Sequence, residues 1–447
     1  MNKKPFQYLV SLYLLATSCC VLADDIETGT FDAAIQRAFA NRPELNIERS
    51  KIQGAKTRVD EAKGMFFPTL NAFATDQHIK GYDDFSGVTA NAQIGATNYL
   101  IAIAKTTPQY QLNYGVELNY NLYSGGRHIA QLREMSASED AAHAQYDVLR
   151  KQILLDVTEQ YWGFRKAQIT LLMAKRSLDY AKEEMRVAVE QFKQGRIAKI
   201  ELDAKTLAAE KQAVDARKAT RTLLDYRRRY AFTLGVEAAK EEELQQFEPK
   251  DKAENINIEM LIPSLGLMKE PEIQKVQADL IGAQMRAKQS RSEYLPVIDL
   301  FARYTEVGRS DIGFVEAQAN LGKDATFIGV KLTWNLFDGF KSDSRITRAT
   351  AESEQFRFQV EKSQRDFNHN KQEMQADEED VSDQLQLASK QLEFTQSQVA
   401  IARKRLDVGQ HSSLEFHATQ LALDNARSTV DKLKIDTLIQ RIKKGLY

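Results

Sequence analysis

The sequence predicts a mainly helical protein with four barrel-type strands, built as an internal tandem repeat. Two stretches without proline, residues 127–194 and 341–408, carry apolar residues every seven positions. This spacing is typical of helices that pack lengthwise as coiled coils, and each stretch would be on the order of 100 Å long. A short segment of alternating polar and apolar residues precedes each stretch. Helices of this length do not fit into one globular core, so we expect an elongated helical layer that is built twice.

Residues 1–23 have the features of a secretory signal peptide. A positive start and an apolar run lead to the small-residue cleavage site Val21-Leu22-Ala23. The two cysteines of the chain, Cys19 and Cys20, lie within this segment. A competing interpretation makes one of them a lipid-anchored terminus, although the leucine that usually precedes such a site is missing. Cleavage would leave a mature chain without thiol chemistry or disulfides.

The bulk composition limits the partners and the way in which the chain can enter a membrane. A formal net charge of −1 gives no basic excess, so no nucleic-acid partner is expected. Beyond the signal, no apolar run approaches the ~20 residues of a membrane-spanning helix, and the longest extends from Tyr99 to Ala104. If the mature protein enters a membrane, it therefore does so as strands.

The two halves of the sequence follow the same order of signals. Pro43-Glu44-Leu45 corresponds to Pro271-Glu272-Ile273, and each opens a predicted helix that ends near Gly64 or Arg291. Such a long correspondence indicates a duplicated structural unit. The expected organisation is a signal peptide at 1–23, a first repeat at 24–235, an inter-repeat segment at 236–270 and a second repeat at 271–447.

Each half contains two predicted strands, and the second strand of each pair has two different faces. Around Val116 and Val330, apolar and aromatic residues alternate with polar ones. This is typical of a barrel strand with lipid outside and water inside, although a half-buried strand of a soluble sheet has the same period. Four strands cannot close a barrel, so strands of several chains would have to combine. The loop 81–111 is expected at the outer mouth, and whether it obstructs the opening is left open.

Each long helix is expected to end at a glycine and to turn back into a shorter helix. Gly195 and Gly409 stand at the usual helix-stopping position. The shorter helices are predicted over 199–235 and 413–443, so each half should form an antiparallel hairpin. The acidic run within 373–383 is interpreted as a solvated face or as part of a tunnel lining, and Arg227-Arg228-Arg229 as surface or inter-helix pairing.

These features together resemble the TolC family of outer-membrane efflux and type I secretion channels. The resemblance covers about residues 30–443, and it rests on the repeated proline-led helices, the strand exits Asn121-Leu122-Tyr123-Ser124-Gly125-Gly126 and Asn335-Leu336-Phe337-Asp338-Gly339, and the glycine-centred tips. It implies a homotrimer with one barrel in outer-membrane lipid, continuous with a long α-helical barrel in the periplasm of a Gram-negative bacterium. It also implies two partners, a periplasmic adaptor (membrane fusion protein) and an inner-membrane pump.

The resemblance also implies roles for residues at the hairpin tips. Glu201 and Glu415 stand where the family usually has acids at the narrow end, and acidic rings there would favour cations. Leu406 replaces the family's usual aromatic residue, and His411 lies where some members carry an arginine that helps to hold the gate shut. The expected periplasmic gate is Glu201, Glu415, Leu406 and His411, and the expected adaptor-docking tips are Gly195, Arg196, Ile197, Gly409 and Gln410.

The position of His411 suggests a specific hypothesis for how the gate opens. We expect His411 of one hairpin to lie near an acid such as Glu201, so that the gate loosens when the ring loses its proton. The alternative is a solvated loop histidine without a role in gating.

Other kinds of chemistry are not expected. The six histidines show no pairing with acids that suits a metal site, and phosphate loops and catalytic constellations are missing from the sequence. We therefore expect no metal, no cofactor and no enzymatic activity. The second hypothesis is a periplasmic coiled-coil adaptor or structural protein without a pore, a class that lacks paired two-faced strands. The cargo, small toxic molecules or secreted proteins, is left open.

Overall fold

The computed structural model describes residues 29–79, 88–94, 97–103, 109–236 and 248–446. The described residues form two compact units. The helical unit comprises those up to Pro43 and those within 150–267 and 373–446, and the sheet unit comprises those within 44–149 and 268–372. The predicted signal peptide 1–23, and with it the alternative of lipidation at Cys19 or Cys20, lies outside the described residues.

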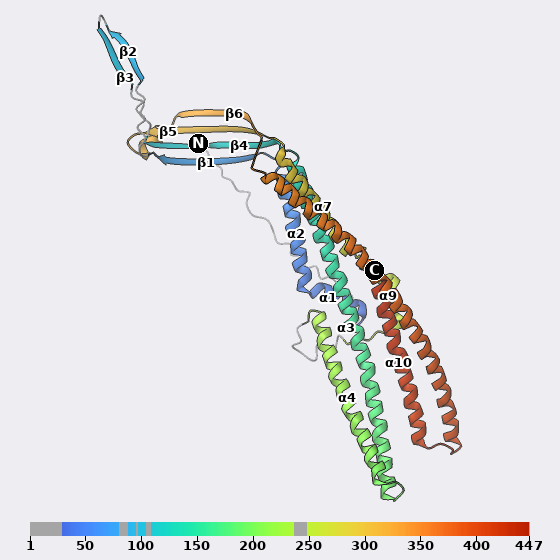
Figure 1. Ribbon diagram of the computed structural model, residues 1–447. Helices are drawn as coiled ribbons and strands as arrows, with labels where there is room; N and C mark the ends of the chain where they lie inside the picture. Colours follow the sequence, from blue (N-terminus) through green and yellow to red (C-terminus); the bar gives the residue numbers. More distant parts are fainter. Residues whose placement is uncertain (1–28, 80–87, 95–96, 104–108, 237–247, 447) are drawn as a thin grey trace, which may run out of the picture. The chain divides into compact units, whose positions relative to one another are not determined.

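The sheet unit contains a four-stranded antiparallel sheet with the order β1-β4-β5-β6 (Figure 1). The centre pairs one strand from each repeat, β4 with β5, and β1 and β6 form the edges. Each edge strand carries a row of backbone groups that no other described strand pairs. The bounds are β1 (Thr69–His78), β4 (Tyr110–Tyr123), β5 (Val297–Ser310) and β6 (Lys323–Thr333).

A separate two-stranded sheet occupies part of the segment 81–111, which is predicted to be a loop. β2 (Val88–Ile94) pairs antiparallel with β3 (Thr97–Ile103). The loop prediction for 81–111 is therefore wrong for these residues. The apolar run that begins at Tyr99 lies largely within β3, because β-branched and aromatic residues favour extended backbone.

Short helices connect the strands and lead into them. α2 (Pro43–Gly64) and α7 (Pro271–Arg291) begin at the repeated prolines, whose fixed φ suits a first helical turn. Both predicted helices are confirmed. The 3-10 turn η2 (Ser292–Tyr294) leads from α7 into β5. The short helix α8 (Phe314–Ala319), which was not predicted from the sequence, lies between β5 and β6.

The long helices are α3 (Arg127–Lys193) and α9 (Lys341–Asp407), and each contributes residues to both units. The shorter helices α4 (Lys199–Thr233) and α10 (Ser413–Gly445) follow them. All four match their predicted bounds to within two residues. None of the described helices is long and apolar enough to cross a lipid bilayer.

The inter-repeat segment and the start of the described region add three elements that were not predicted. They are α1 (Phe31–Asn41), the 3-10 turn η1 (Ala253–Asn255) and α6 (Ile258–Ser264). The Thr30 side chain caps α1 by accepting from the Ala33 N–H. All three elements belong to the helical unit.

An aromatic cluster around the middle of α3 forms the core of the helical unit. Tyr161, Trp162 and Phe164 are fully buried. Phe31 of α1 packs on Tyr161 with ring centroids 5.3 Å apart, and Tyr230 of α4 packs on Phe164 at 6.0 Å. Buried aromatic rings contribute large contact areas, so this cluster holds α1, α3 and α4 together.

Side-chain contacts at the level of this core place α3 between α4 and α10. Tyr226 of α4 packs against Gly163 of α3, where a Cβ would lie 2.5 Å from the tyrosine ring. On another side of α3, the Glu159 carboxylate pairs with Lys443 of α10 at 2.9 Å. The glycine therefore allows close packing with α4, and an ion pair joins α3 to α10.

The last helix of this layer is α9, which contacts α10. Glu378 of α9 pairs with Arg441 of α10 at 3.4 Å and with Lys444 at 2.6 Å. Among the described residues, no hydrogen bond or ion pair joins α9 to α3 or to α4. The order at this level is therefore α4–α3–α10–α9, with α4 and α9 on the outside.

Candidate functional site

The register of the four-stranded sheet produces an exposed apolar face. Val116 of β4 lies opposite Tyr304 of β5, and Leu300 of β5 lies opposite Val330 of β6. Val330 is 62% exposed in the single chain. A contiguous exposed apolar surface marks contact with lipid or with another protein. The same face carries Leu70, Ala72, Ala74, Leu112, Tyr114, Leu118, Tyr120, Ile298, Ala302, Ile328 and Leu332. At one end of this face lie the carboxylates Asp76, Glu306 and Asp324, and Glu306 accepts hydrogen bonds from Tyr114 and Tyr304.

The opposite face of the sheet carries ion pairs and amides. Arg303 of β5 donates to the Glu117 carboxylate of β4, with Nε 2.8 Å from Oε2. The Asn121 amide donates to Asp299 Oδ1 at 2.7 Å. Charged groups of this kind suit a water-filled interior rather than lipid. The alternation predicted around Val116 and Val330 is confirmed.

Glycines at matching places in the two repeats allow close approach within the sheet. A Cβ on Gly115 would lie 2.0 Å from the Tyr304 carbonyl oxygen. A Cβ on Gly329 would lie 2.9 Å from Cζ of Phe301, which covers that position from the neighbouring strand. The two glycines are therefore needed for close packing between neighbouring strands. Their repetition in the sequence alone does not reveal this role.

The first hairpin tip joins α3 to α4 through a glycine turn. Gly195 has φ +69°, a left-handed conformation that favours glycine, and its N–H donates to the Phe192 carbonyl at 2.9 Å. Arg196 is exposed and Ile197 is half-buried. The N-cap of α4 is Ala198, which has no side-chain acceptor for the free N–H groups of the first turn.

The second tip joins α9 to α10 and carries an additional set of hydrogen bonds. Gly409 has φ +74°, and the Gln410 N–H donates to the Arg405 carbonyl at 2.8 Å. Ser412 and Glu415 form a capping box, in which the Ser412 N–H donates to Glu415 Oε2 at 2.7 Å and the Glu415 N–H donates to Ser412 Oγ at 3.2 Å. The bonds from Ser412 lower the pKa of Glu415.

His411 lies between two charged neighbours of its own hairpin. Its Nδ1 is 3.7 Å from Glu415 Oε2, which is too far for a hydrogen bond but close enough for an ion pair when the ring is protonated. Its Nε2 is 3.4 Å from the Arg405 guanidinium. Leu406 is half-buried nearby. Among the described residues, no hydrogen bond or ion pair links His411 to Glu201, so that pairing stays a prediction.

The two tip acids occupy the same place in the two repeats but differ in their contacts. Glu415 is held by the capping box. Glu201 is exposed in the first turn of α4, and within the described residues its carboxylate accepts no hydrogen bond and forms no ion pair. Glu201 is therefore available to a partner outside the chain, whereas Glu415 already has a structural role.

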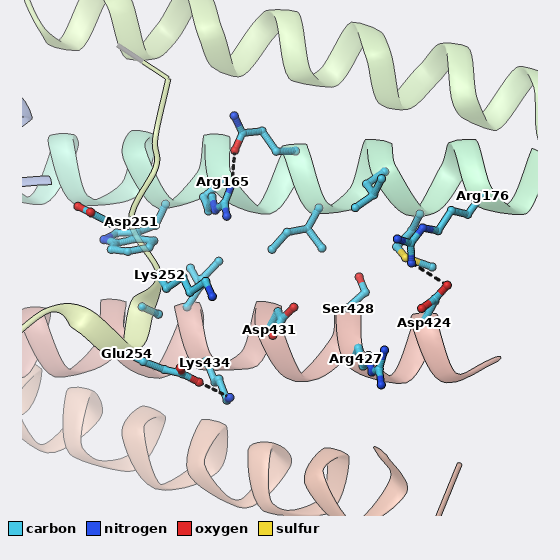
Figure 2. A pocket seen from close by; sticks show the side chains of 17 residues that line it. Arg165, Arg176, Asp251, Lys252, Glu254, Asp424, Arg427, Ser428, Asp431 and Lys434 are labelled. Atoms are coloured by element: carbon cyan, nitrogen blue, oxygen red, sulfur yellow. Dashed lines mark hydrogen bonds and ion pairs between the residues drawn. The ribbon is translucent and has the colours of Figure 1, made fainter. Parts of the chain in front are cut away.

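A cavity in the helical unit was not predicted from the sequence. It has a volume of about 710 Å³ and lies between α3, α10 and residues 251–254 (Figure 2). Arg176 of α3 pairs with Asp424 of α10 at 2.6 Å, and Lys434 of α10 pairs with Glu254. Its walls come from three segments far apart in the sequence, so no local motif could have indicated it.

The sequence matches the family described as outer membrane efflux protein over residues 34–231 and 262–443. Each matched segment covers most of one repeat, so the duplication predicted from the sequence is confirmed. No curated protein matches the sequence.

Several solved structures share the fold over nearly the whole chain. The outer membrane protein VceC from Vibrio cholerae has a TM-score of 0.72 and 13% identity, with 93% of this chain and 95% of that chain covered. The Campylobacter jejuni outer membrane channel CmeC has a TM-score of 0.72 and 15% identity, with 93% and 86% covered. A membrane protein from Pseudomonas aeruginosa has a TM-score of 0.72 and 14% identity, with 94% and 91% covered.

Proposed function

This chain belongs to the outer membrane efflux protein family, and we propose that three copies of it close into one channel. That channel is the exit duct of a tripartite efflux or type I secretion system. It exports small toxic molecules, secreted proteins or both. A periplasmic adaptor and an inner-membrane pump deliver the cargo to it.

Family membership gives the coarser part of this function. The protein is an efflux channel of the Gram-negative outer membrane, and its family is one of channels. The alternative of a coiled-coil protein without a pore is not favoured by this match. Family membership does not give the number of copies, the partners or the absence of enzymatic activity, and these are part of our proposal.

The observation that carries the proposal is the pair of unpaired edges on a sheet with an exposed apolar face. β1 and β6 are the edges, and Val330 and Leu332 on β6 are each 62% exposed. Lipid supplies no hydrogen bonds to backbone groups, so an open sheet edge is not tolerated within a bilayer. Closure therefore requires β6 of one copy to pair with β1 of the next.

Three copies would bring the strand number to about twelve, which lies within the range of outer-membrane barrels. The face with Glu117 and Arg303 would then line the interior, and the apolar face would meet lipid. In this assembly the repeats at 24–235 and 271–447 alternate around the ring, joined within each copy by the segment 236–270.

The hairpin tips supply the proposed gate and docking surface. Three copies of Glu201 around an axis would form an acidic ring that favours cations, with Glu415, Leu406 and His411 beside it. The exposed Arg196 and Gln410 project from the turns at Gly195 and Gly409, and with the half-buried Ile197 they form the surface for the adaptor.

The experiment is a mass measurement on the detergent-purified protein by light scattering, followed by conductance in planar bilayers. A particle of three copies that conducts ions supports the proposal. A monomer that needs no detergent would show that the strands do not combine. A matched pair of variants tests the lining: Glu117→Gln should change the ion selectivity, whereas Glu352→Gln, at a position outside the strands, should not.

A further inference from the structure

We propose that an acidic stripe on α9 of one copy binds a basic stripe on α4 of the next copy, and that this contact fixes the height at which neighbouring copies join. The inference rests on the proposed function, because it requires a ring of copies. Its partner is a second copy of this chain, and it concerns only residues of the helical unit.

The acidic stripe consists of Glu373, Asp377 and Asp380. Their spacing of four and three residues places them on one side of α9. All three are exposed, and within the described residues none of them forms an ion pair. Asp380 accepts a hydrogen bond only from Gln384 of the same helix. Like charges at this spacing destabilise an isolated helix, so a cationic partner would stabilise the stripe.

The basic stripe consists of Arg217, Arg221 and Arg228. Spacings of four and seven residues place them on one side of α4, away from the face that packs on α3. All three are exposed. Arg228 reaches Asp225 of its own helix at 4.0 Å, and no carboxylate of the described residues pairs with Arg217 or Arg221.

The two stripes meet at one end along the helical layer, where Arg228 of α4 lies near the level of Asp377 of α9. Tyr226 of α4 packs at Gly163 of α3. Lys443 of α10 pairs with Glu159 of α3, and the neighbouring Arg441 and Lys444 pair with Glu378 of α9. Glu378 therefore lies near the height of Glu159, about one turn from Gly163. Arg228 is two positions from Tyr226, and Asp377 is adjacent to Glu378. At about 1.5 Å per residue, Arg228 and Asp377 therefore come within a few ångströms of one level, whereas Arg221 lies about 10 Å further along α4, within reach of Asp380 only through extended side chains.

The helix order leaves one way to close the layer into a ring. α4 and α9 are the outer helices of the order α4–α3–α10–α9, so the α9 edge of one copy must meet the α4 edge of the next. Such a head-to-tail contact is heterologous, and it generates a ring when the rotation closes. The edges carry opposite charges, which favours this pairing over contacts between two α4 or two α9 edges.

Charge reversal tests the contact. One variant combines Arg221→Glu with Arg228→Glu, and a second combines Asp377→Lys with Asp380→Lys. Each should lower the temperature at which trimers dissociate in detergent by about 5 °C or more, because like charges then face each other at every contact. The protein with all four substitutions should recover the original dissociation temperature to within about 2 °C.

The control changes the same charge on another side of α4. Lys218→Glu with Arg229→Glu alters two exposed cations of the same helix that do not lie on the stripe. This control should leave the dissociation temperature unchanged. Raising salt from about 0.1 M to about 1 M shortens the Debye length from about 10 Å to about 3 Å. The unaltered trimer should then lose stability, while each charge-reversed variant should gain it.

The possible outcomes separate this inference from the proposed function. If the unaltered protein is a monomer, the trimer itself is refuted. If it is a trimer and both charge-reversed variants dissociate at the same temperature as the control, the stripe contact is refuted alone. Reversed variants that keep their trimers but no longer bind a co-expressed adaptor would assign the stripes to the adaptor and also refute the contact. Recovery in the four-substitution protein supports it.

Discussion

At the scale of single residues, Gly115 is one of two sheet glycines, with Gly308, at which an added Cβ would lie 2.0 Å from a backbone oxygen. Any side chain at Gly115 would place Cβ 2.0 Å from the Tyr304 carbonyl oxygen, a backbone atom that cannot move aside. We expect Gly115→Ala to separate β4 from β5 locally and to destabilise the sheet by about 2–3 kcal/mol. The measurement is the yield of heat-modifiable trimers extracted from the outer membrane, which should fall sharply.

A matched glycine outside the sheet serves as the control. Gly54 lies within α2, and nothing lies within 4 Å of the Cβ that alanine would add. Gly54→Ala should therefore leave the trimer yield intact and favour the helix by roughly 0.5–1 kcal/mol. A normal trimer yield from Gly115→Ala would refute the packing argument.

Glu415 gives the second tip a specific pH dependence. The Ser412 N–H and hydroxyl groups hold the pKa of this carboxyl below its usual value. A lowered folded-state pKa contributes stability that is fully present above the unfolded value and is lost as the pH falls through the folded value. The protection of the amides at 412–416 from hydrogen exchange, taken relative to the intrinsic exchange rate at each pH, should therefore fall below about pH 4. Glu415→Gln should show lower protection already at pH 7 and little further change in protection on acidification.

His411 tests gating in the neutral range. If the protonated ring holds the gate through a nearby carboxylate, conductance should rise between pH 5 and pH 8 as the ring loses its charge. The same titration of His411→Ala should give a nearly flat profile. An unaltered pH profile in this variant would identify His411 as a solvated loop residue, with Glu415 as a neighbour of no consequence for the gate.

At the scale of elements, the two hairpins share a backbone but differ in how the second helix begins. α10 begins with the capping box of Ser412 and Glu415, whereas α4 begins after Ala198 without a side-chain cap. Ala198→Ser would create the pattern Ser-x-x-Glu with Glu201. We expect it to stabilise the first turn of α4 by about 0.5–2 kcal/mol and to slow hydrogen exchange there.

The same substitution tests the proposed use of Glu201. A capped Glu201 would bond to its own backbone, so Ala198→Ser should weaken the cation preference of the channel. Ser412→Ala is the matched change in the other hairpin, and it should destabilise α10 while leaving Glu201 unaffected. Equal cation selectivity in all three proteins would show that capping does not take the Glu201 charge out of the ring, and unchanged selectivity in Glu201→Gln would exclude Glu201 from it.

The elements that the sequence predicts well are those with a long period or a repeated breaker. The seven-residue spacing and the glycines fix α3, α4, α9 and α10 to within two residues, and Pro43 and Pro271 mark α2 and α7. α1, η1 and α6 are too short to show a clear period, and their place depends on contacts such as Phe31 with Tyr161. The hairpin of β2 and β3 lies in a segment that has no counterpart in the second repeat. Comparison of the two repeats therefore could not predict these strands.

The candidate site shows the same division between local and distant causes. Gly195 and Gly409 are predicted because a left-handed turn demands glycine locally. The cap of Ser412 has an equally local signature, Ser-x-x-Glu, and it could have been recognised. The cavity lined by Arg176, Asp424 and Glu254 depends on three distant segments, and no pattern in one of them encodes it.

At the scale of the whole molecule, each unit separately requires the same kind of contact between copies. The sheet unit has one edge from the first repeat, β1, and one from the second, β6. The helical unit likewise has α4 of the first repeat and α9 of the second on its outside. In both units the first-repeat edge must meet a second-repeat edge of another copy. A duplicated protein therefore forms a ring in which the two repeats alternate, with every contact of the head-to-tail type.

Mixing the two charge-reversed variants tests whether α9 of one copy contacts α4 of the next, and it also tests the number of copies in the ring. The all-acidic variant carries Arg221→Glu and Arg228→Glu, and the all-basic variant carries Asp377→Lys and Asp380→Lys. Where the two variants are neighbours, both kinds of contact are complementary, and like charges meet only where two copies of the same variant are adjacent. A ring with an even number of copies can alternate completely, whereas a ring of three always keeps one contact between identical copies.

Co-expression of the all-acidic and all-basic variants should therefore give trimers of intermediate stability. Two of their three contacts are restored, so the dissociation temperature should recover about two thirds of the loss seen in each variant alone, because separate contacts contribute nearly additively. The measurement is thermal dissociation of assemblies that carry a different affinity tag on each variant, purified through both tags. Complete recovery would indicate an even-numbered ring. No recovery would show that α4 and α9 do not meet between copies, since a head-to-tail ring of any size gains complementary contacts when the two variants mix.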